Sequence, residues 1–163
     1  MSLTRGAALL TLAASCLFPA ACTSAHHGTD GSPTRPASTS ASADARSSLV
    51  AQMTTLCRAS SDELRAAAAH AFGQQRPTTA AWRAFMMGTA LPIITRQLDG
   101  IAALPHAPAD DDSSIAAIVK AGREAVAAAT QDSTLLMPGS SAPFDTYDRL
   151  ATAYGIPACN LGT

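Results

Sequence analysis

The sequence predicts an all-α protein, a small four-helix bundle (five helices if Pro92 breaks one of them) closed by one disulfide bond. The chain is rich in Ala, the residue that costs least free energy in a helix, and it has only four Phe, two Tyr and one Trp. Apolar residues recur at steps of three and four in separate segments, which is the spacing of one helix face. Two cysteines, Cys57 and Cys159, both lie in the part of the chain that is predicted to be helical.

The first 21 residues are expected to form an export signal. Arg5 supplies a positive charge, and the apolar stretch 7–18 is too short to cross a bilayer. Pro19-Ala20-Ala21 then precedes Cys22, and this arrangement resembles the bacterial lipobox, although Pro19 stands where Leu is usual. In a lipobox the cysteine receives a diacylglycerol and becomes the first residue of the mature chain. Cys16 is a rival lipidation site, and simple cleavage with secretion is the third outcome.

Residues 22–45 are predicted to be a disordered, Ser/Thr/Pro-rich tether. Small polar residues with Pro and Gly bury too little apolar surface to offset the entropy of ordering. His26 and His27 lie in this tether, which would hold no further ligands in place, so no metal site or cofactor is expected there. The helical domain is predicted to cover residues 46–163.

The first helix is predicted from about residue 45 to 72. Leu49, Met53 and Cys57 begin an apolar stripe that keeps its phase along this whole range. Residues 60–63 could instead start a new helix with a capping box, but the unbroken stripe favours one long helix. Gly73, followed by Pro77, is expected to end it.

The second helical segment is predicted to start near residues 77–78. Trp82 and Phe85 lie on one face, whereas the apolar positions beyond Pro92 lie on a face rotated by well over 90°. Proline removes a backbone donor and crowds the preceding turn. The segment is therefore expected to kink or to divide into two short helices.

This second segment also carries the candidate binding groove. Met-rich apolar surface adapts to varied partners, although ordinary core packing is the alternative use of such residues. The residues of the candidate groove are Trp82, Met86, Met87 and Leu91.

Two further helices are predicted. Loop 104–114 ends in acidic residues that suit a helix N-terminus, and Gly122 in the stripe that follows would permit close approach of another helix. After loop 134–143, the last helix is expected to turn Phe144, Tyr147, Leu150, Ala151 and Tyr154 inward.

The end of the last helix predicts a covalent closure. Gly155 suits a left-handed C-terminal cap, Ile156 suits the hydrophobic contact of that cap, and Pro157 prevents the helix from resuming. Cys57 and Cys159 are the cysteines that remain after signal removal, and an exported chain most often pairs two such cysteines.

The closing stretch fits the pattern A-x-x-Y-G-(I/L)-x-x-C, carried here by Ala151, Tyr154, Gly155, Ile156 and Cys159. With the lipobox and the tether, it resembles small actinobacterial lipoproteins and secreted helical proteins of unassigned function. That resemblance implies a helical fold and an extracytoplasmic address. It implies no activity.

Function is predicted mainly from the expected location outside the cytoplasm. The chain lacks G-x-S-x-G, H-E-x-x-H and phosphate-binding glycine motifs, and its 11 basic and 12 acidic residues leave no electrostatic footprint for nucleic acid. We expect a non-catalytic binding or interaction module at the extracytoplasmic face of the cell membrane, anchored through Cys22, or secreted if Cys22 is not lipidated. Its partner is an unknown protein or small molecule.

The alternative function is a small extracytoplasmic metal carrier or enzyme that uses His70 or His106. Glu63 and His70 lie two turns apart on one helix face, where they could bind a cation or exchange a proton. His106 lies close to the acidic run 110–112 and could gather a metal in the loop. The alternative for Glu63 and His70 is a solvated side of the helix without function. The alternative for the acidic run 110–112 is a helix cap next to an ordinary loop histidine.

Overall fold

The computed structural model describes residues 38–105, 109–140 and 142–161, which belong to one compact unit, Pro36–Thr163. The export signal, Cys16, Cys22 and the first part of the tether lie outside these residues. The α-helices are α1 (Ser38–Phe72), α2 (Thr79–Phe85), α3 (Leu91–Ala102), α4 (Ala109–Gln131) and α5 (Asp145–Tyr154). The short turns are η1 (Met86–Ala90, π-helical), η2 (Ser133–Leu135) and η3 (Pro157–Cys159).

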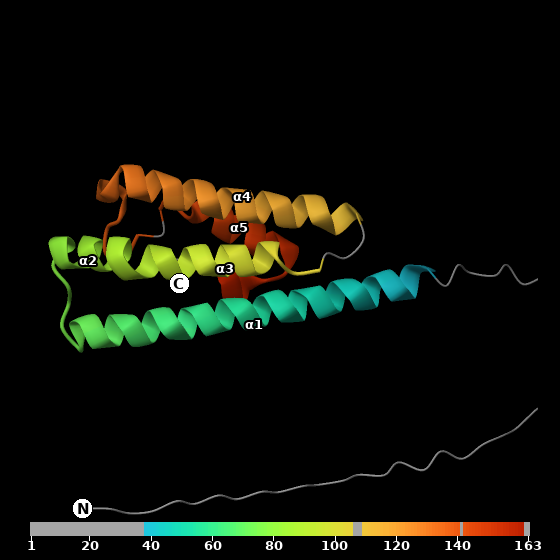
Figure 1. Ribbon diagram of the computed structural model, residues 1–163, viewed down its shortest axis with the longest axis horizontal. Helices are drawn as coiled ribbons and strands as arrows, with labels where there is room; N and C mark the ends of the chain where they lie inside the picture. The colour runs from blue at the N-terminus through green and yellow to red at the C-terminus, as the bar shows by residue number, and fades with distance from the viewer. Residues whose placement is uncertain (1–37, 106–108, 141, 162–163) are drawn as a thin grey trace, which may run out of the picture. The chain divides into compact units, whose positions relative to one another are not determined.

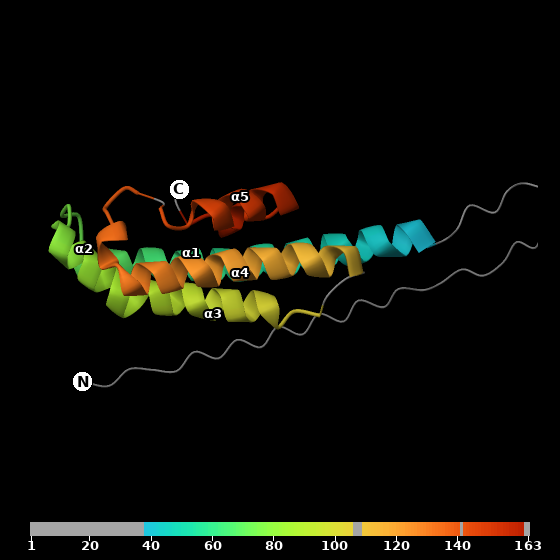
Figure 2. The ribbon, with the colours of Figure 1, turned by 90° about the horizontal axis from the view of Figure 1, so that it is seen from above.

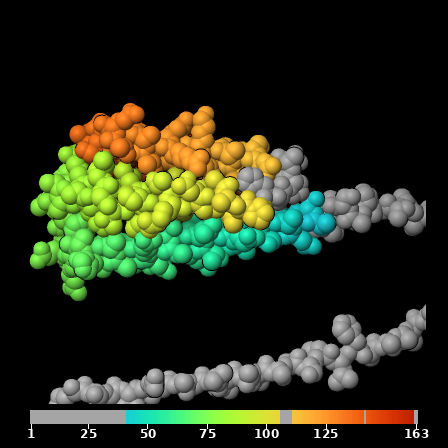
Figure 3. Space-filling view, viewed as in Figure 1, coloured from blue at the N-terminus to red at the C-terminus, as the bar shows by residue number. Residues whose placement is uncertain are grey.

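Because α2, η1 and α3 run on as one continuous segment, the described chain forms four helices, and it contains no strand. This confirms the predicted all-α bundle. Figure 1 shows α3 between α1 and α4, and contacts join α3 to both neighbours. Seen from above, α5 lies on the opposite side of α4 from α3 (Figure 2). In the space-filling view, side chains of α1, α3 and α4 close over one face (Figure 3).

Helix α1 is a single long helix, as its unbroken apolar stripe predicts. It begins at Ser38 rather than near residue 46, so residues 38–45 are helical and not tether. These residues contain neither Gly nor Pro, and the helix that forms downstream extends through them at low cost. At the other end, Gly73 has φ 57°, and its N–H donates to the Ala69 carbonyl at 2.8 Å.

The change of face in the second segment is made by the π-helical turn η1 rather than by a division at Pro92. The Leu91 N–H donates to the Met86 carbonyl, five residues back. Pro92 has no N–H to donate and needs space for its ring, and a wider turn directly before it meets both demands. The extra residue in this turn rotates α3 relative to α2, so that Phe85 and Leu98 are both buried.

Helix α4 begins at Ala109, so the acidic run 110–112 occupies its first turn instead of the preceding loop. Asp111 is only 9% exposed, and its Oδ1 lies 3.6 Å from Nε of Arg46 on α1. Farther along, Gly122 lies against its neighbours: a Cβ there would be 2.5 Å from Leu98 Cδ2 and 3.1 Å from Tyr147 Cδ2. The predicted close approach of helices at Gly122 is confirmed.

The core fills the space between the helices and includes most of the predicted inward positions. Tyr147 and Ala151 are fully buried, and Leu150 is half-buried against the core. The other principal core residues are Leu49, Met53, Leu91, Ile94, Leu98, Ile101, Ile115, Ile118, Val119, Phe144, Tyr154 and Ile156. None of the described helices is both long enough and apolar enough to span a membrane.

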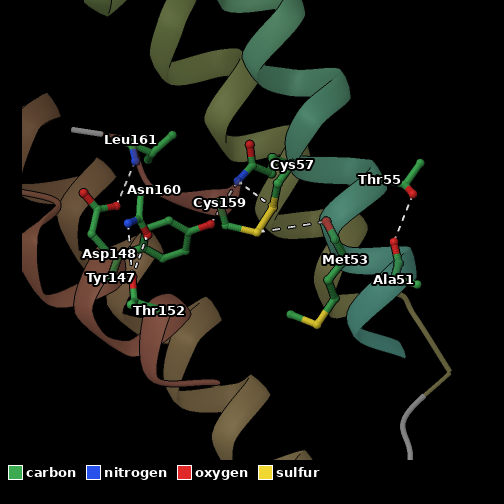
Figure 4. The surroundings of a disulfide bond; sticks show 11 residues. Ala51, Met53, Thr55, Cys57, Tyr147, Asp148, Thr152, Cys159, Asn160 and Leu161 are labelled. Atoms are coloured by element: carbon green, nitrogen blue, oxygen red, sulfur yellow. Dashed lines mark hydrogen bonds between the residues drawn. A yellow bond between two sulfur atoms is a disulfide. The ribbon is translucent and has the colours of Figure 1, made fainter. Parts of the chain in front are cut away.

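The end of α5 is closed as predicted. Gly155 is left-handed with φ 103°, the Ile156 N–H donates to the Ala151 carbonyl at 2.9 Å, and the Gly155 N–H donates to the Thr152 carbonyl at 3.1 Å. These two bonds are those of a Schellman motif. The chain then turns through η3 to a buried disulfide between Cys57 and Cys159, which confirms the predicted bridge (Figure 4).

Candidate ligand-binding cleft

A cleft of about 600 Å³ opens between α1, the segment from α2 to α3, the loop before α5 and the C-terminal tail. Small-molecule sites generally have volumes of about 300–1,000 Å³, so the cleft is large enough for a ligand. Its floor is apolar. Phe85 and Ile94 line it from the second segment, and Leu136 and Phe144 line it from the loop; all four residues are buried.

One end of the cleft is aromatic. Phe72, in the last turn of α1, has its ring centroid 6.1 Å from that of Trp82 and 5.1 Å from that of Phe85. The Trp82 and Phe85 rings are 5.9 Å apart. Trp82 is half-buried and lines the cleft, so its indole ring would contact any ligand that fills this end.

Helix α1 supplies a wall because two of its faces are used. Leu49, Met53 and Cys57 face the core, whereas a second row of residues, at similar steps, faces the cleft. That row runs Arg58, Ser61, Asp62, Leu64, Arg65 and Ala68.

The charges of this wall are unequally matched. Arg65 Nη1 and Asp62 Oδ1 form an ion pair at 2.7 Å. Arg58 is exposed and forms no ion pair with any described residue. The charged side chains that line the described part of the cleft, Arg58, Asp62 and Arg65, therefore leave a net charge of one positive unit.

The tail wall is fastened at several points. The disulfide joins Cys159 to α1, Asn160 Nδ2 donates to Thr152 Oγ1 at 3.1 Å, and the Leu161 N–H donates to Asp148 Oδ1 at 2.9 Å (Figure 4). Asn160 and Leu161 both line the cleft. Two different elements, α1 and α5, thus hold this wall in position.

The structure divides the predicted groove residues between cleft and core. Trp82 and Met86 line the cleft. Leu91 is 4% exposed within the core, and Met87 packs against the core outside the cleft. The π-helical turn is the reason, because it changes which side of the segment the residues after Met86 face.

In the predicted acid–histidine pair, Glu63 has an arginine as its partner. Glu63 Oε1 accepts a hydrogen bond from Arg96 Nη2 on α3, and His70 is exposed in the last turn of α1. His106 and the side chain of Asp110 lie outside the described residues. Within the described ranges, no three His, Cys, Asp or Glu side chains gather closely enough to hold a metal ion.

Two tyrosines outside the cleft, Tyr147 and Tyr154, interact with polar side chains of other helices. Gln97 Nε2 donates to the Tyr147 hydroxyl at 2.9 Å, and burial raises the pKa of Tyr147 to about 12. The Arg46 guanidinium lies 5.1 Å from the centre of the Tyr154 ring. Burial, and then the Asp111 carboxylate, raise the pKa of Tyr154. Neither group lines the cleft.

Sequence reasoning missed Arg58, Leu136 and the tail residue Leu161 as parts of a site. For Arg58 and Leu161, the one feature of the sequence that could have indicated the site is their nearness to the two bridged cysteines, Cys57 and Cys159. No protein-family model, curated protein or solved structure matches this chain.

Proposed function

We propose that this protein is a lipid-anchored extracytoplasmic binding module, and that its ligand site is the cleft beside α1. The observation that carries the proposal is the cleft itself: about 600 Å³ with an apolar floor. A concave, mostly apolar site with a few polar groups at its edge is the usual form of a small-molecule site. The lipobox-like stretch before Cys22 and the resemblance to small lipoproteins support the address.

Two structural features support binding rather than simple core packing. The floor residues are already packed in the folded chain: Ile94 belongs to the buried core, and the Phe85 ring contacts those of Phe72 and Trp82. Met86 and Met137 line the cleft, and flexible methionine side chains adapt to ligands of varied shape. The metal-carrier or enzyme alternative, through His70 or His106, stays a prediction.

The test is mass spectrometry of the protein taken from its native membrane fraction. Under denaturing conditions, we expect a chain that starts at Cys22, carries a diacylglycerol and is two hydrogens short because of the disulfide. Under native conditions, we expect additional mass from a bound ligand. An unlipidated chain found in the medium would remove the anchor from the proposal.

A matched pair of variants locates the ligand. Ala68→Phe places a ring in the cleft from the α1 wall, and Ala117→Phe places the same ring on the exposed side of α4. We expect Ala68→Phe to lose the additional native mass and Ala117→Phe to keep it. Equal retention by both variants, or no additional mass in the wild-type chain, would contradict the cleft as a ligand site.

A further inference from the structure

The charges around the cleft indicate the chemistry of its ligand. Of the charged side chains that line it, Asp62 and Arg65 neutralise each other, and Arg58 has no partner among the described residues. A guanidinium presents a planar fork of donors that matches a carboxylate or a phosphate. The cleft therefore offers one binding position for an anion beside an apolar floor.

The positive charge and the aromatic cluster lie at opposite ends of the cleft. Arg58 follows Cys57, so it adjoins the disulfide and the tail residues Ala158 and Asn160. Ala68 lies ten residues farther along α1 (58 to 68), which is about 15 Å of helix, and Phe72 beyond it contacts Trp82. A ligand that reaches both ends must be elongated, anionic at one end and apolar along the rest.

We propose that the cleft binds an anionic amphiphile, with its carboxylate or phosphate on Arg58 and its apolar chain along the floor toward Trp82. This inference rests on the proposed binding function and specifies its ligand class. Phe85, Ile94 and Leu136 contact the chain, and the exposed position of Arg58 leaves the headgroup at the solvent edge. The carboxylate of a free fatty acid and the phosphate of a lipid share this chemistry.

Trp82 provides the readout, because it is the only Trp in the sequence and it lines the cleft. The full chain is used with Cys16→Ala and Cys22→Ala, so that no lipid is attached and no detergent competes. Its fluorescence is titrated with tetradecanoate, tetradecyl phosphate, tetradecanol and tetradecyltrimethylammonium, each below its micelle concentration. We expect saturable binding of at least one anion, about tenfold tighter than binding of the alcohol or the cation.

Two arginine variants test the headgroup position. Arg58→Gln is expected to weaken binding of the anion about tenfold and to leave binding of tetradecanol unchanged. Arg149→Gln, which removes an exposed arginine of α5 outside the cleft, is the matched control and is expected to change neither. The comparison of the four probes on the chain with native Arg58 needs neither variant to fold.

The outcomes separate this inference from the proposed function. Binding of only the phosphate or only the carboxylate supports the inference and identifies the source of the headgroup. Equal binding of all four probes, with no effect of Arg58→Gln, overturns the anionic ligand; if Ala68→Phe still blocks binding, the cleft stands as a ligand site. No response of Trp82 to any probe overturns the inference, and additional native mass that Ala68→Phe removes would then still support the cleft.

Discussion

Gln97 on α3 donates a hydrogen bond to the Tyr147 hydroxyl on α5, with 2.9 Å between Nε2 and the phenolic oxygen, and both side chains are buried. The same nitrogen lies 3.4 Å from Cys57 Sγ on α1. A single amide therefore joins three helices at the level of the disulfide. A buried polar group of this kind is costly to leave without its partner.

Tyr147→Phe is expected to lower the free energy of unfolding by about 1–2 kcal/mol, because it leaves the buried Gln97 amide without its oxygen acceptor. Denaturant unfolding of the oxidised protein measures this difference. Adding Gln97→Met to Tyr147→Phe removes both partners and should recover part of the loss. Gln97→Met is also measured alone. If the double variant loses as much unfolding free energy as the two single variants together, the bond is not the source of the effect.

Stability is expected to fall in alkali because of the buried tyrosines. Burial raises the pKa of Tyr147 from 10.0 to about 12. Above pH 10 the unfolded chain releases the Tyr147 proton while the folded chain retains it. The contribution is therefore fully present below pH 10 and is lost as pH rises toward 12, by at most about 1.4 kcal/mol per pH unit for this residue.

Urea unfolding followed across that alkaline range measures the slope. Tyr154, whose pKa is also raised, contributes in the same direction. The Tyr147→Phe chain is the control, and its stability should fall less steeply with pH than that of the wild type. Parallel slopes for the two chains would contradict an assignment to Tyr147.

Removal of the disulfide is expected to cause the largest loss of stability. Cys57 and Cys159 are separated by 102 residues, and the chain-entropy model gives about 4–5 kcal/mol for a loop of that size. The double variant Cys57→Ala and Cys159→Ala, compared with wild type by denaturant unfolding, tests this value. A loss below about 1 kcal/mol would show that the reduced unfolded chain is already compact.

Gly122→Ala is expected to destabilise the protein by about 1–3 kcal/mol, although alanine is the better helix former. The new methyl carbon would lie 2.5 and 2.9 Å from the two Leu98 methyl carbons. Gly100→Ala is the matched control, because its nearest neighbours, the Leu56 methyls, would be at 3.6 Å. It should stabilise α3 by up to about 1 kcal/mol. Thermal unfolding of both variants would contradict this account if Gly122→Ala were the more stable.

Local chemistry in the sequence was enough to predict the helices and their closure. Gly73 and Gly155 mark the two left-handed helix ends, and each follows the last residue of an apolar stripe. The pairing of Cys57 with Cys159, which the structure contains, was predicted from the expected export signal and from the count of cysteines. These inferences needed no knowledge of which helices are neighbours.

The cleft could not be predicted in the same way, because its walls meet only in the folded bundle. Arg58 and Leu161 line one site although they lie far apart in sequence, and no periodicity connects them. The π-helical turn was also missed, because a rotated stripe before Pro92 fits a kink equally well. Because of that turn, Met86 lines the cleft and Leu91 is buried in the core.

The bond between Cys57 and Cys159 also determines how the folded unit carries mechanical load. Between Ser38 and Leu161, the shortest covalent path follows α1 to Cys57, crosses the two sulfurs and leaves through Asn160. The chain from residue 58 to residue 158 forms a closed loop outside that path and therefore bears no tension. A pull on the two ends can lengthen only residues 38–57 of α1 and the last tail residues, and the loop that contains most of the cleft cannot be extended.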